Sequence, residues 1–308
     1  MKRREFLSKS FKVGAFAGSV FTIPGFYNNN FSSKSYASSN YDLVAIKGGE
    51  PDIMFDEAIK QLGGMQNFVK KNQKVVVKPN IGWDVVPELG ANTNPKLISR
   101  VIEHCFNAGA KEVYVFDNTC DDWRRCYDRS GIESAVKNAK GQIVPGNSES
   151  YYQSVSIKNG KKLTNAKVHE LVLDCDVFIN IPVLKHHSST QLSIAMKNLM
   201  GIVWDRRYWH RNDLHQCIAD FSAFGNKPTL NIIDAYNVMK KNGPRGVSKA
   251  DVVVMKSQII SKDIVAADAA SAKLFGMEPE NIGYIKLANQ LGAGKMDLNS
   301  LQIKRIIL

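Results

Sequence analysis

Side chains that can carry charge or transfer protons follow four apolar segments of the sequence, at the point where each segment ends. The segments are short and rich in β-branched residues, which predicts strands at 74–78, 112–116, 176–181 and 229–233. The polar residues at or just after their ends are Lys78, Asn80, Asp117, Lys185, His186, His187 and Asp234. Because the carboxyl ends of parallel strands meet at one edge of an open sheet, these residues are expected to face one cleft.

The stretch from residue 177 to 201 holds most of the positive charge at this edge. Its apolar run is closed by Pro182, a basic turn follows, and a helix is predicted near 189–199. The basic and amide side chains of the turn and the helix are Lys185, His186, His187, Lys197 and Asn198. A strand that leads into such a turn is typical of a site for an anionic ligand. Neighbouring residues of an extended chain point in opposite directions, so at most one of the two histidines faces that ligand.

Acid–base chemistry on an anionic small molecule is the activity that these residue types favour. His187 or Asp117 is expected to transfer a proton. Lys185 and Lys197 are expected to stabilise negative charge. The residues expected to bind the substrate are Lys78, Asn80, Asn198, Asp234 and Arg245. Structural roles are the alternatives, with Lys78 at a sheet edge and the two aspartates as helix caps or turn formers.

A bound metal is a second interpretation, because imidazole groups are common ligands of transition metals. His186, His187 and His210 are the candidate ligands. No H-x-x-x-H or H-E-x-x-H pattern occurs, so the sequence does not decide whether a metal binds or which metal it is. The five cysteines include no C-x-x-C pair and no ferredoxin-type run, so no iron–sulfur cluster is expected. Cys120 and Cys126 could pair after export, and their spacing does not decide it.

Residues 203–213 are predicted to form a long loop that mixes cations with aromatic rings. Its central part, 204–211, suits an anionic or cyclic ligand held by stacking and bidentate hydrogen bonds. The alternative is that its tryptophans pack onto the fold. P-loop, G-x-G-x-x-G and G-x-S-x-G motifs are missing from the sequence, which argues against kinases, Rossmann dehydrogenases and serine hydrolases.

The first residues carry the parts of a twin-arginine export signal. In order, these parts are Arg3-Arg4, Phe6-Leu7, an uncharged stretch at 13–23 and the cleavage site Ser35-Tyr36-Ala37. We expect a signal peptide at 1–37 that engages the twin-arginine translocase, a linker at 38–42, and a mature protein in the periplasm or cell envelope. The stretch is too short for a stable membrane span. Cleavage lowers the net charge from +12 to about +7, and nothing in an exported chain of this kind favours nucleic acid.

Strands and helices alternate from residue 43 onward, which predicts an α/β fold with a largely parallel or mixed sheet and helices on both faces. Asn94 and Pro95 mark the start of one helix, and a later helix is predicted over 264–275. Alternating polar residues predict a β-hairpin insertion at 148–168. We expect one domain at 43–308, or two lobes at 43–147 and 169–308.

The chain also resembles the domain of unknown function 362 family, with motifs in the family's order over about residues 43–292. These motifs are Lys78-Pro79-Asn80, Asn94-Pro95, Ala108-Gly109-Ala110, Leu184-Lys185-His186, Met196–Gly201, Ile233-Asp234, Asn242-Gly243-Pro244 and Val265–Ala269. The resemblance implies twin-arginine export. It implies no iron–sulfur cluster, because the cysteines of the family's ferredoxin module are missing here. It leaves open whether His186 or His187 is the histidine that matters.

We therefore expect an exported enzyme that acts on an anionic small molecule, with proton-transfer or redox chemistry favoured over hydrolysis and with a metal or redox cofactor left open. One alternative is a non-catalytic carrier of a ligand or cofactor, or a maturation factor for an exported metalloenzyme. Another is a surface glycan-binding module that uses residues 204–211 as its platform.

Overall fold

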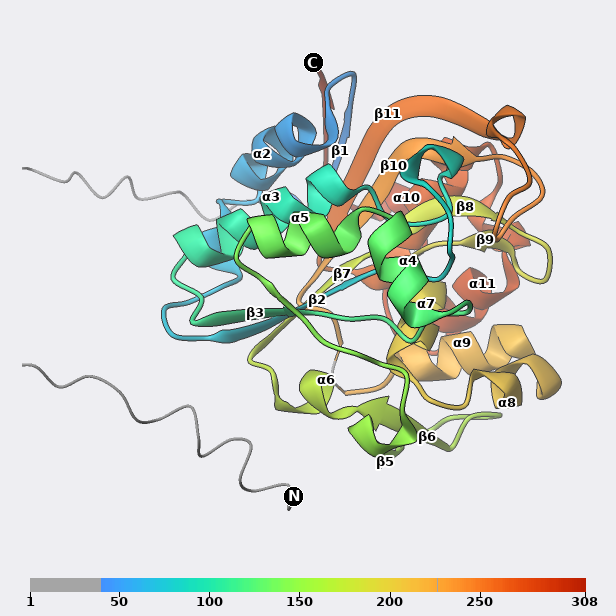
Figure 1. Cartoon of the computed structure of the whole chain (residues 1–308). Coiled ribbons are helices and arrows are strands. Elements are labelled where there is room, and N and C mark those ends of the chain that lie inside the picture. The colour runs from blue at the N-terminus through green and yellow to red at the C-terminus, as the bar shows by residue number, and fades with distance from the viewer. Residues whose placement is uncertain (1–39, 226) are drawn as a thin grey trace, which may run out of the picture. The chain divides into compact units, whose positions relative to one another are not determined.

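The computed structural model describes residues 40–225 and 227–308 (Figure 1), so the predicted signal peptide at 1–37 lies outside the described residues. Its strands are β1 (Leu43–Lys47), β2 (Lys74–Pro79), β3 (Glu112–Val115), β4 (Gln142–Ile143), β5 (Tyr152–Ser156), β6 (Asn165–His169), β7 (Val177–Ile181), β8 (Val183–His187), β9 (Gln191–Ser193), β10 (Leu230–Met239), β11 (Val252–Ser261) and β12 (Ile303–Ile307). Its helices are α2 (Pro51–Gln61), α3 (Pro95–Asn107), α4 (Trp123–Arg129), α5 (Ile132–Asn138), α6 (Glu170–Asp174), α7 (Ala195–Asn198), α8 (Arg206–Arg211), α9 (Leu214–Ser222), α10 (Ile264–Phe275) and α11 (Gly283–Gln290). Within this part of the chain, no helix combines the length and the apolar character that a bilayer span requires.

Ten strands form one mixed sheet in the order β12-β1-β11-β10-β7-β2-β3-β4, with β8 paired to β10 and β9 paired to β8. From β10 to β4 the neighbouring strands are parallel, whereas β11 runs antiparallel to both β10 and β1. The predicted α/β fold with a mixed sheet is thereby confirmed. β5 and β6 pair separately as an antiparallel hairpin, which confirms the insertion predicted at 148–168.

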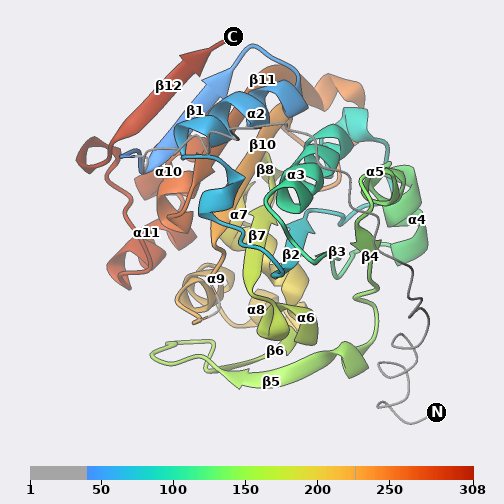
Figure 2. The same cartoon turned by 90° about the vertical axis from the view of Figure 1, so that its left-hand side faces the viewer.

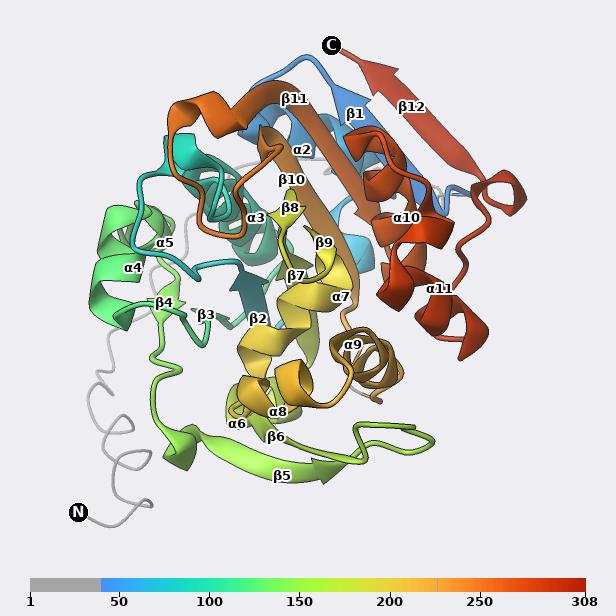
Figure 3. The same ribbon diagram turned by 90° about the vertical axis from the view of Figure 1, so that its right-hand side faces the viewer.

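Helices cover both faces of the sheet (Figures 2 and 3), and each face has its own apolar core. α2, α3 and α5 pack on one face, and α7, α9, α10 and α11 pack on the other. Successive residues of β2 divide between the two cores, because Val75 and Val77 belong to the first and Val76 to the second. Each such buried valine stabilises the fold by roughly 1.5–3 kcal/mol. The polar strand ends therefore stand on a sheet that is packed from both sides.

Local signals in the sequence place two of these helices correctly. The Asn94 side chain accepts a hydrogen bond from the Lys96 N–H at the start of α3, and Pro95 occupies the first helical position. α10 has the predicted bounds. Asp263 accepts hydrogen bonds from the first free N–H groups of this helix, and Gly276 ends it in the left-handed conformation, with φ at 95°.

Four predictions near the basic stretch are wrong. The turn expected after Pro182 is strand β8, because its backbone pairs with β9 and β10. The helix expected near 189–199 shrinks to α7, since β9 occupies residues 191–193. The long loop expected at 203–213 contains α8, which Asp205 caps. The strand expected to end at residue 233 continues to Met239, so Asp234 lies inside β10.

Candidate functional site

A cleft of about 440 Å³ lies at the carboxyl ends of β2 and β3 and is bordered by β8, α7 and α8. We call it the lysine cleft. Its chemically active lining residues are Lys78, Asn80, Asp117, Cys120, Lys185, His187, Lys197, Asn198, Arg206, Arg207 and His210. The structure thus brings together most of the residues predicted for the site. Those that do not line this cleft are His186, Asp234 and Arg245.

Lys78 is a buried ammonium group that forms one ion pair and two hydrogen bonds. Its Nζ lies 2.9 Å from Asp117 Oδ1, and it donates to the Pro79 carbonyl oxygen at 2.7 Å and to Asn198 Oδ1 at 3.0 Å. Burial lowers the pKa of Lys78, and the Asp117 carboxylate opposes that shift. The second carboxylate oxygen of Asp117 accepts a hydrogen bond from the Ile81 N–H. This pair therefore forms a fixed floor of the cleft.

Lys185 is only 1% exposed and lacks a carboxylate partner among the described residues. Its Nζ donates to the Ala91 carbonyl oxygen and to Asn80 Oδ1, the latter at 3.5 Å. Two acceptors suit a neutral amine, which has two N–H bonds and one lone pair. Burial lowers the pKa of Lys185 to about 7, so the side chain exchanges its proton near neutral pH.

Lys197 is the third lysine of the cleft. Its Nζ donates a hydrogen bond to the Met200 thioether sulfur at 3.2 Å, which is a weak acceptor. Burial lowers the pKa of Lys197 to about 8. Among the described residues its ammonium group thus lacks the carboxylate that a desolvated cation would ordinarily have, and an anion in the cleft would take that place.

Arginines add to the positive charge at the mouth of the cleft. Arg206 donates to the carbonyl oxygens of Asn118 and Thr119, each at 2.7 Å, which fixes its guanidinium group without neutralising it. Arg207 forms no ion pair with the described part of the chain. Asp117 is the one carboxylate among the residues that line the cleft. The cleft is therefore suited to an anion.

His187 and His186 face opposite ways along β8, as the extended chain requires. His187 lines the cleft, and its Nδ1 accepts a hydrogen bond from the Ser189 N–H, which leaves its proton on Nε2. Burial lowers the pKa of His187 to about 2, so the ring is a neutral donor and a poor base. His186 Nδ1 instead accepts from the Gly243 N–H, outside the cleft. Across residues 40–225 and 227–308, no three His, Cys, Asp or Glu side chains come together as a metal site.

A chain of four amide side chains supports the cleft, of which Asn80 is half-buried and the other three are buried. Asn80 donates to Asn198 Oδ1 at 3.3 Å, Asn198 donates to Asn180 Oδ1 at 2.8 Å, and Asn180 donates to Asn231 Oδ1 at 3.0 Å. The four residues come from the end of β2, α7, β7 and β10 in turn. The sequence places Asn180 and Asn231 inside apolar strands. A polar amide within an apolar strand could have indicated this hydrogen-bonded row of asparagines.

Asp268 holds α7 in place, although it does not line the cleft. Its two oxygens accept hydrogen bonds from the N–H groups of Ala195 and Met196 at the start of that helix. This role was not predicted from the sequence. A charged residue within the alanine-rich helix α10 could have indicated that Asp268 has a buried hydrogen-bond partner. Cys120 was also missed as a lining residue, because it does not end a strand, whereas Arg206 lies in the 204–211 segment predicted to hold an anionic or cyclic ligand.

Other candidates are placed elsewhere. Asp234 is buried in β10 and accepts hydrogen bonds from the N–H groups of Asn94 and Tyr236. Arg245 is exposed, 3.6 Å from Asp121.

Trp209 is 1% exposed and packs against Phe221, so it cannot form a surface platform for a glycan. Cys120 is an exposed free thiol and Cys126 a buried one, so the structure pairs neither.

Comparison with known proteins places the chain among relatives. The family model for "Domain of unknown function (DUF362)" matches residues 75–273. The thylakoid-associated protein sll1697 of Synechocystis sp. is 25% identical over 245 residues, which cover 76% of this chain and 73% of the relative. Two solved structures each have a TM-score of 0.49 and cover 79% of this chain: the lactate racemase apoprotein of Thermoanaerobacterium thermosaccharolyticum, at 10% identity, and a protein of Thermotoga maritima, at 12%. The match spans 58% and 60% of those two chains.

Proposed function

This chain belongs to the DUF362 family, and we propose that it is an enzyme that binds a small carboxylate- or phosphate-bearing molecule in the lysine cleft and transfers a proton to or from it. One observation carries the proposal. Lys185 and Lys197 lie in one cleft with lowered pKa values, and neither has a carboxylate partner in the described structure. Lysines that are desolvated in this way are typical of anion-binding and proton-transfer sites.

The roles divide according to the partners of each side chain. Lys197 and Arg207 are cations of the cleft that form no ion pair with the described residues, so they would bind the anionic group of the ligand. His187 would donate its Nε2 proton to the same group. Lys185 would act as the base, because its two N–H bonds are engaged and its lone pair is left for a proton.

The proton-transfer step is an exchange between carbon and nitrogen. The neutral Lys185 amine takes a proton from a carbon next to the carbonyl or carboxylate group of the substrate, and the C–H electron pair moves towards that group. Lys197 stabilises the negative charge that develops there. Return of a proton from the Lys185 ammonium group to the carbon restores the enzyme, so the step needs no oxidant.

Deuterium exchange tests this proposal. The protein is incubated in D₂O with a panel of 2-hydroxy and 2-oxo carboxylates, and loss of the C–H signal is followed by NMR, while calorimetry records the binding of oxalate and inorganic phosphate. Lys185→Arg keeps the cation but cannot release its proton, so exchange should be lost while anion binding is retained. The exposed Lys262→Arg is the matched control and should behave as the wild type.

Two outcomes would contradict the proposal in different ways. Anion binding without exchange of any substrate would support a carrier instead of an enzyme. Failure of the wild type to bind either anion would remove the anion site itself.

We also infer export by the twin-arginine route, on the strength of Arg3-Arg4 and the apolar stretch that follows. Changing both arginines to lysine should retain the protein in the cytoplasm, and cell fractionation would show this. Equal release of the variant and the wild type into the periplasm would contradict a twin-arginine signal.

A further inference from the structure

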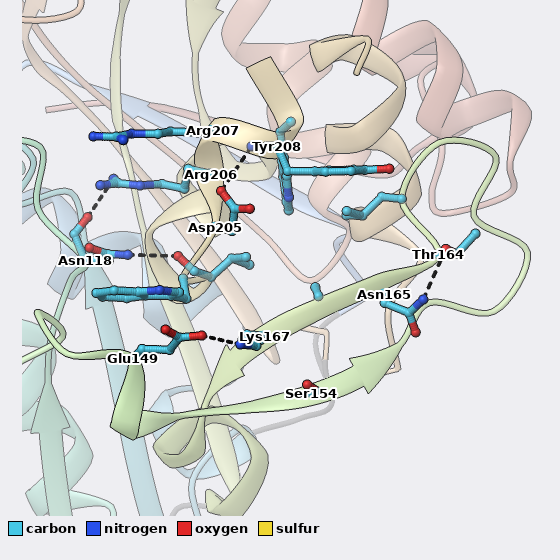
Figure 4. A pocket seen from close by; sticks show the side chains of 15 residues that line it. Asn118, Glu149, Ser154, Thr164, Asn165, Lys167, Asp205, Arg206, Arg207 and Tyr208 are labelled. Atoms are coloured by element: carbon cyan, nitrogen blue, oxygen red, sulfur yellow. Dashed lines mark hydrogen bonds and ion pairs between the residues drawn. The ribbon is translucent and has the colours of Figure 1, made fainter. Parts of the chain in front are cut away.

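A second and larger cavity, of about 790 Å³, adjoins the lysine cleft (Figure 4). It lies between the β5–β6 hairpin on one side and α8 with the residues before it on the other. Arg206 and Arg207 line both cavities, so their side chains form the boundary between the two. Figure 4 shows the two arginines extending side by side in the same direction, with Arg206 bonded to Asn118. We call this cavity the tryptophan pocket, after Trp204 in its wall.

Trp204 offers a fixed aromatic surface in this pocket. Its backbone N–H donates to the Lys167 carbonyl oxygen at 3.0 Å, which ties the residue to β6. Its ring packs against Tyr152, with 5.4 Å between the ring centroids. The side chain is half-buried, so it keeps part of its surface open to the pocket. A ring held in this way stacks on a planar ligand with little loss of side-chain freedom.

The acidic groups of the pocket already have partners. Glu149 pairs with Lys167, and Asp205 accepts a hydrogen bond from the Tyr208 N–H as the cap of α8. Glu149 and Lys167 offset each other at the hairpin, whereas the lysines and arginines outnumber Asp205 and Asp117 towards the lysine cleft, so positive charge increases in that direction. Hydroxyl and amide groups line the outer wall, from Ser154, Thr164 and Asn165. An uncharged, hydroxyl-bearing part of a ligand would suit that wall.

We infer that a single ligand occupies both cavities, with its anionic group in the lysine cleft and a planar ring against Trp204, as in a nucleoside phosphate. This inference rests on the proposed function and adds the chemical class of the ligand. The arginines at the boundary suit the junction between ring and anion, because a guanidinium group both stacks on rings and binds phosphate. A free small anion would use the lysine cleft alone and leave the tryptophan pocket unused.

The test compares three probes that differ by one part each: inorganic phosphate, ribose 5-phosphate and adenosine 5′-monophosphate. Calorimetry measures the affinity of each for the full chain. If the ring stacks on Trp204, the adenosine compound should bind at least about tenfold more tightly than ribose 5-phosphate. Trp204→Ala should remove that difference, and Trp204→Phe should keep most of it. Neither change should alter the affinity for inorganic phosphate, which also shows that both variants are folded.

Trp123→Ala is the matched control, because Trp123 lies on α4 and lines neither cavity. Equal affinity for the adenosine compound and ribose 5-phosphate would overturn the inference, and so would a difference that survives in Trp204→Ala. Both of those results leave phosphate binding, and with it the proposed function, intact. Failure of the wild type to bind any of the three probes would overturn the inference, and failure to bind oxalate as well would instead reject the proposed function.

Discussion

Gly201 lies so close to Asp117 that a Cβ atom on the glycine would be 1.9 Å from the carboxylate Oδ1. The same atom would lie 2.5 Å from Lys78 Nζ, so the glycine leaves the space that the ion pair occupies. Gly201→Ala should push the pair apart and reduce the free energy of unfolding by about 1–3 kcal/mol, as measured by urea denaturation. Gly225→Ala is the control, because a Cβ there meets nothing within 4 Å. Equal stability of the two variants would contradict the tight contact at Gly201.

Lys185→Met should stabilise the protein while it abolishes proton transfer. Methionine fills a similar volume without a desolvated charge, and the gain should be about 1–2 kcal/mol. The folded-state pKa of Lys185, about 7, lies below its unfolded value, so the charged form is penalised in the folded state alone. The gain should therefore be largest below pH 7 and shrink as the pH rises towards 10. A variant less stable than the wild type at pH 6 would be the opposite result.

Affinity for sulfate, which unlike inorganic phosphate keeps the same charge from pH 6 to pH 9, should depend on pH through the same lysines. It should be level below pH 7, fall as Lys185 loses its proton, and fall more steeply above pH 8 as Lys197 follows. Each deprotonated lysine weakens binding by up to about tenfold per pH unit. Calorimetry in buffers of different ionisation enthalpy would also detect the protons taken up on binding. A constant affinity from pH 6 to pH 9 would argue against both groups.

Asp268→Ala should weaken anion binding although Asp268 is outside the cleft. Loss of its two hydrogen bonds frees the start of α7, and Lys197 and Asn198 move with that helix. We expect at least about a tenfold loss of phosphate affinity together with lower stability. Asp263→Ala provides the comparison, since it removes a similar cap from α10 and should lower stability without changing the affinity. An equal loss of affinity in both variants would assign Asp268 to general stability.

The sequence predicts well those helices and strands whose ends and type are determined by residues within the element itself. α3 begins at an asparagine cap followed by proline, and β2 is a valine run that packs on both faces. β8 could not be found in this way, because Lys185, His186 and His187 are not residues that favour a strand, and the pairing of Lys185 with Met239 of β10 is a long-range interaction.

Site residues were likewise predictable where local sequence determines their position, and not where long-range pairing does. Lys78 and Asp117 were predictable as residues at strand ends. Asp234 was not, because β10 runs past it to bond with β8 and β11, which carries the aspartate away from the sheet edge. Asp268 and Arg206 act across the fold on partners far away in the sequence, and neither spacing nor residue type indicates those partners.

The amide chain from Asn80 to Asn231 has a consequence for how the protein responds to acid and base. Amides neither gain nor lose protons over the physiological range, so the bonds that join β2, α7, β7 and β10 are the same whether the lysines above them are charged or neutral. The charge of the cleft can therefore change with pH or with the bound ligand, while the amides beneath it stay uncharged and keep their arrangement.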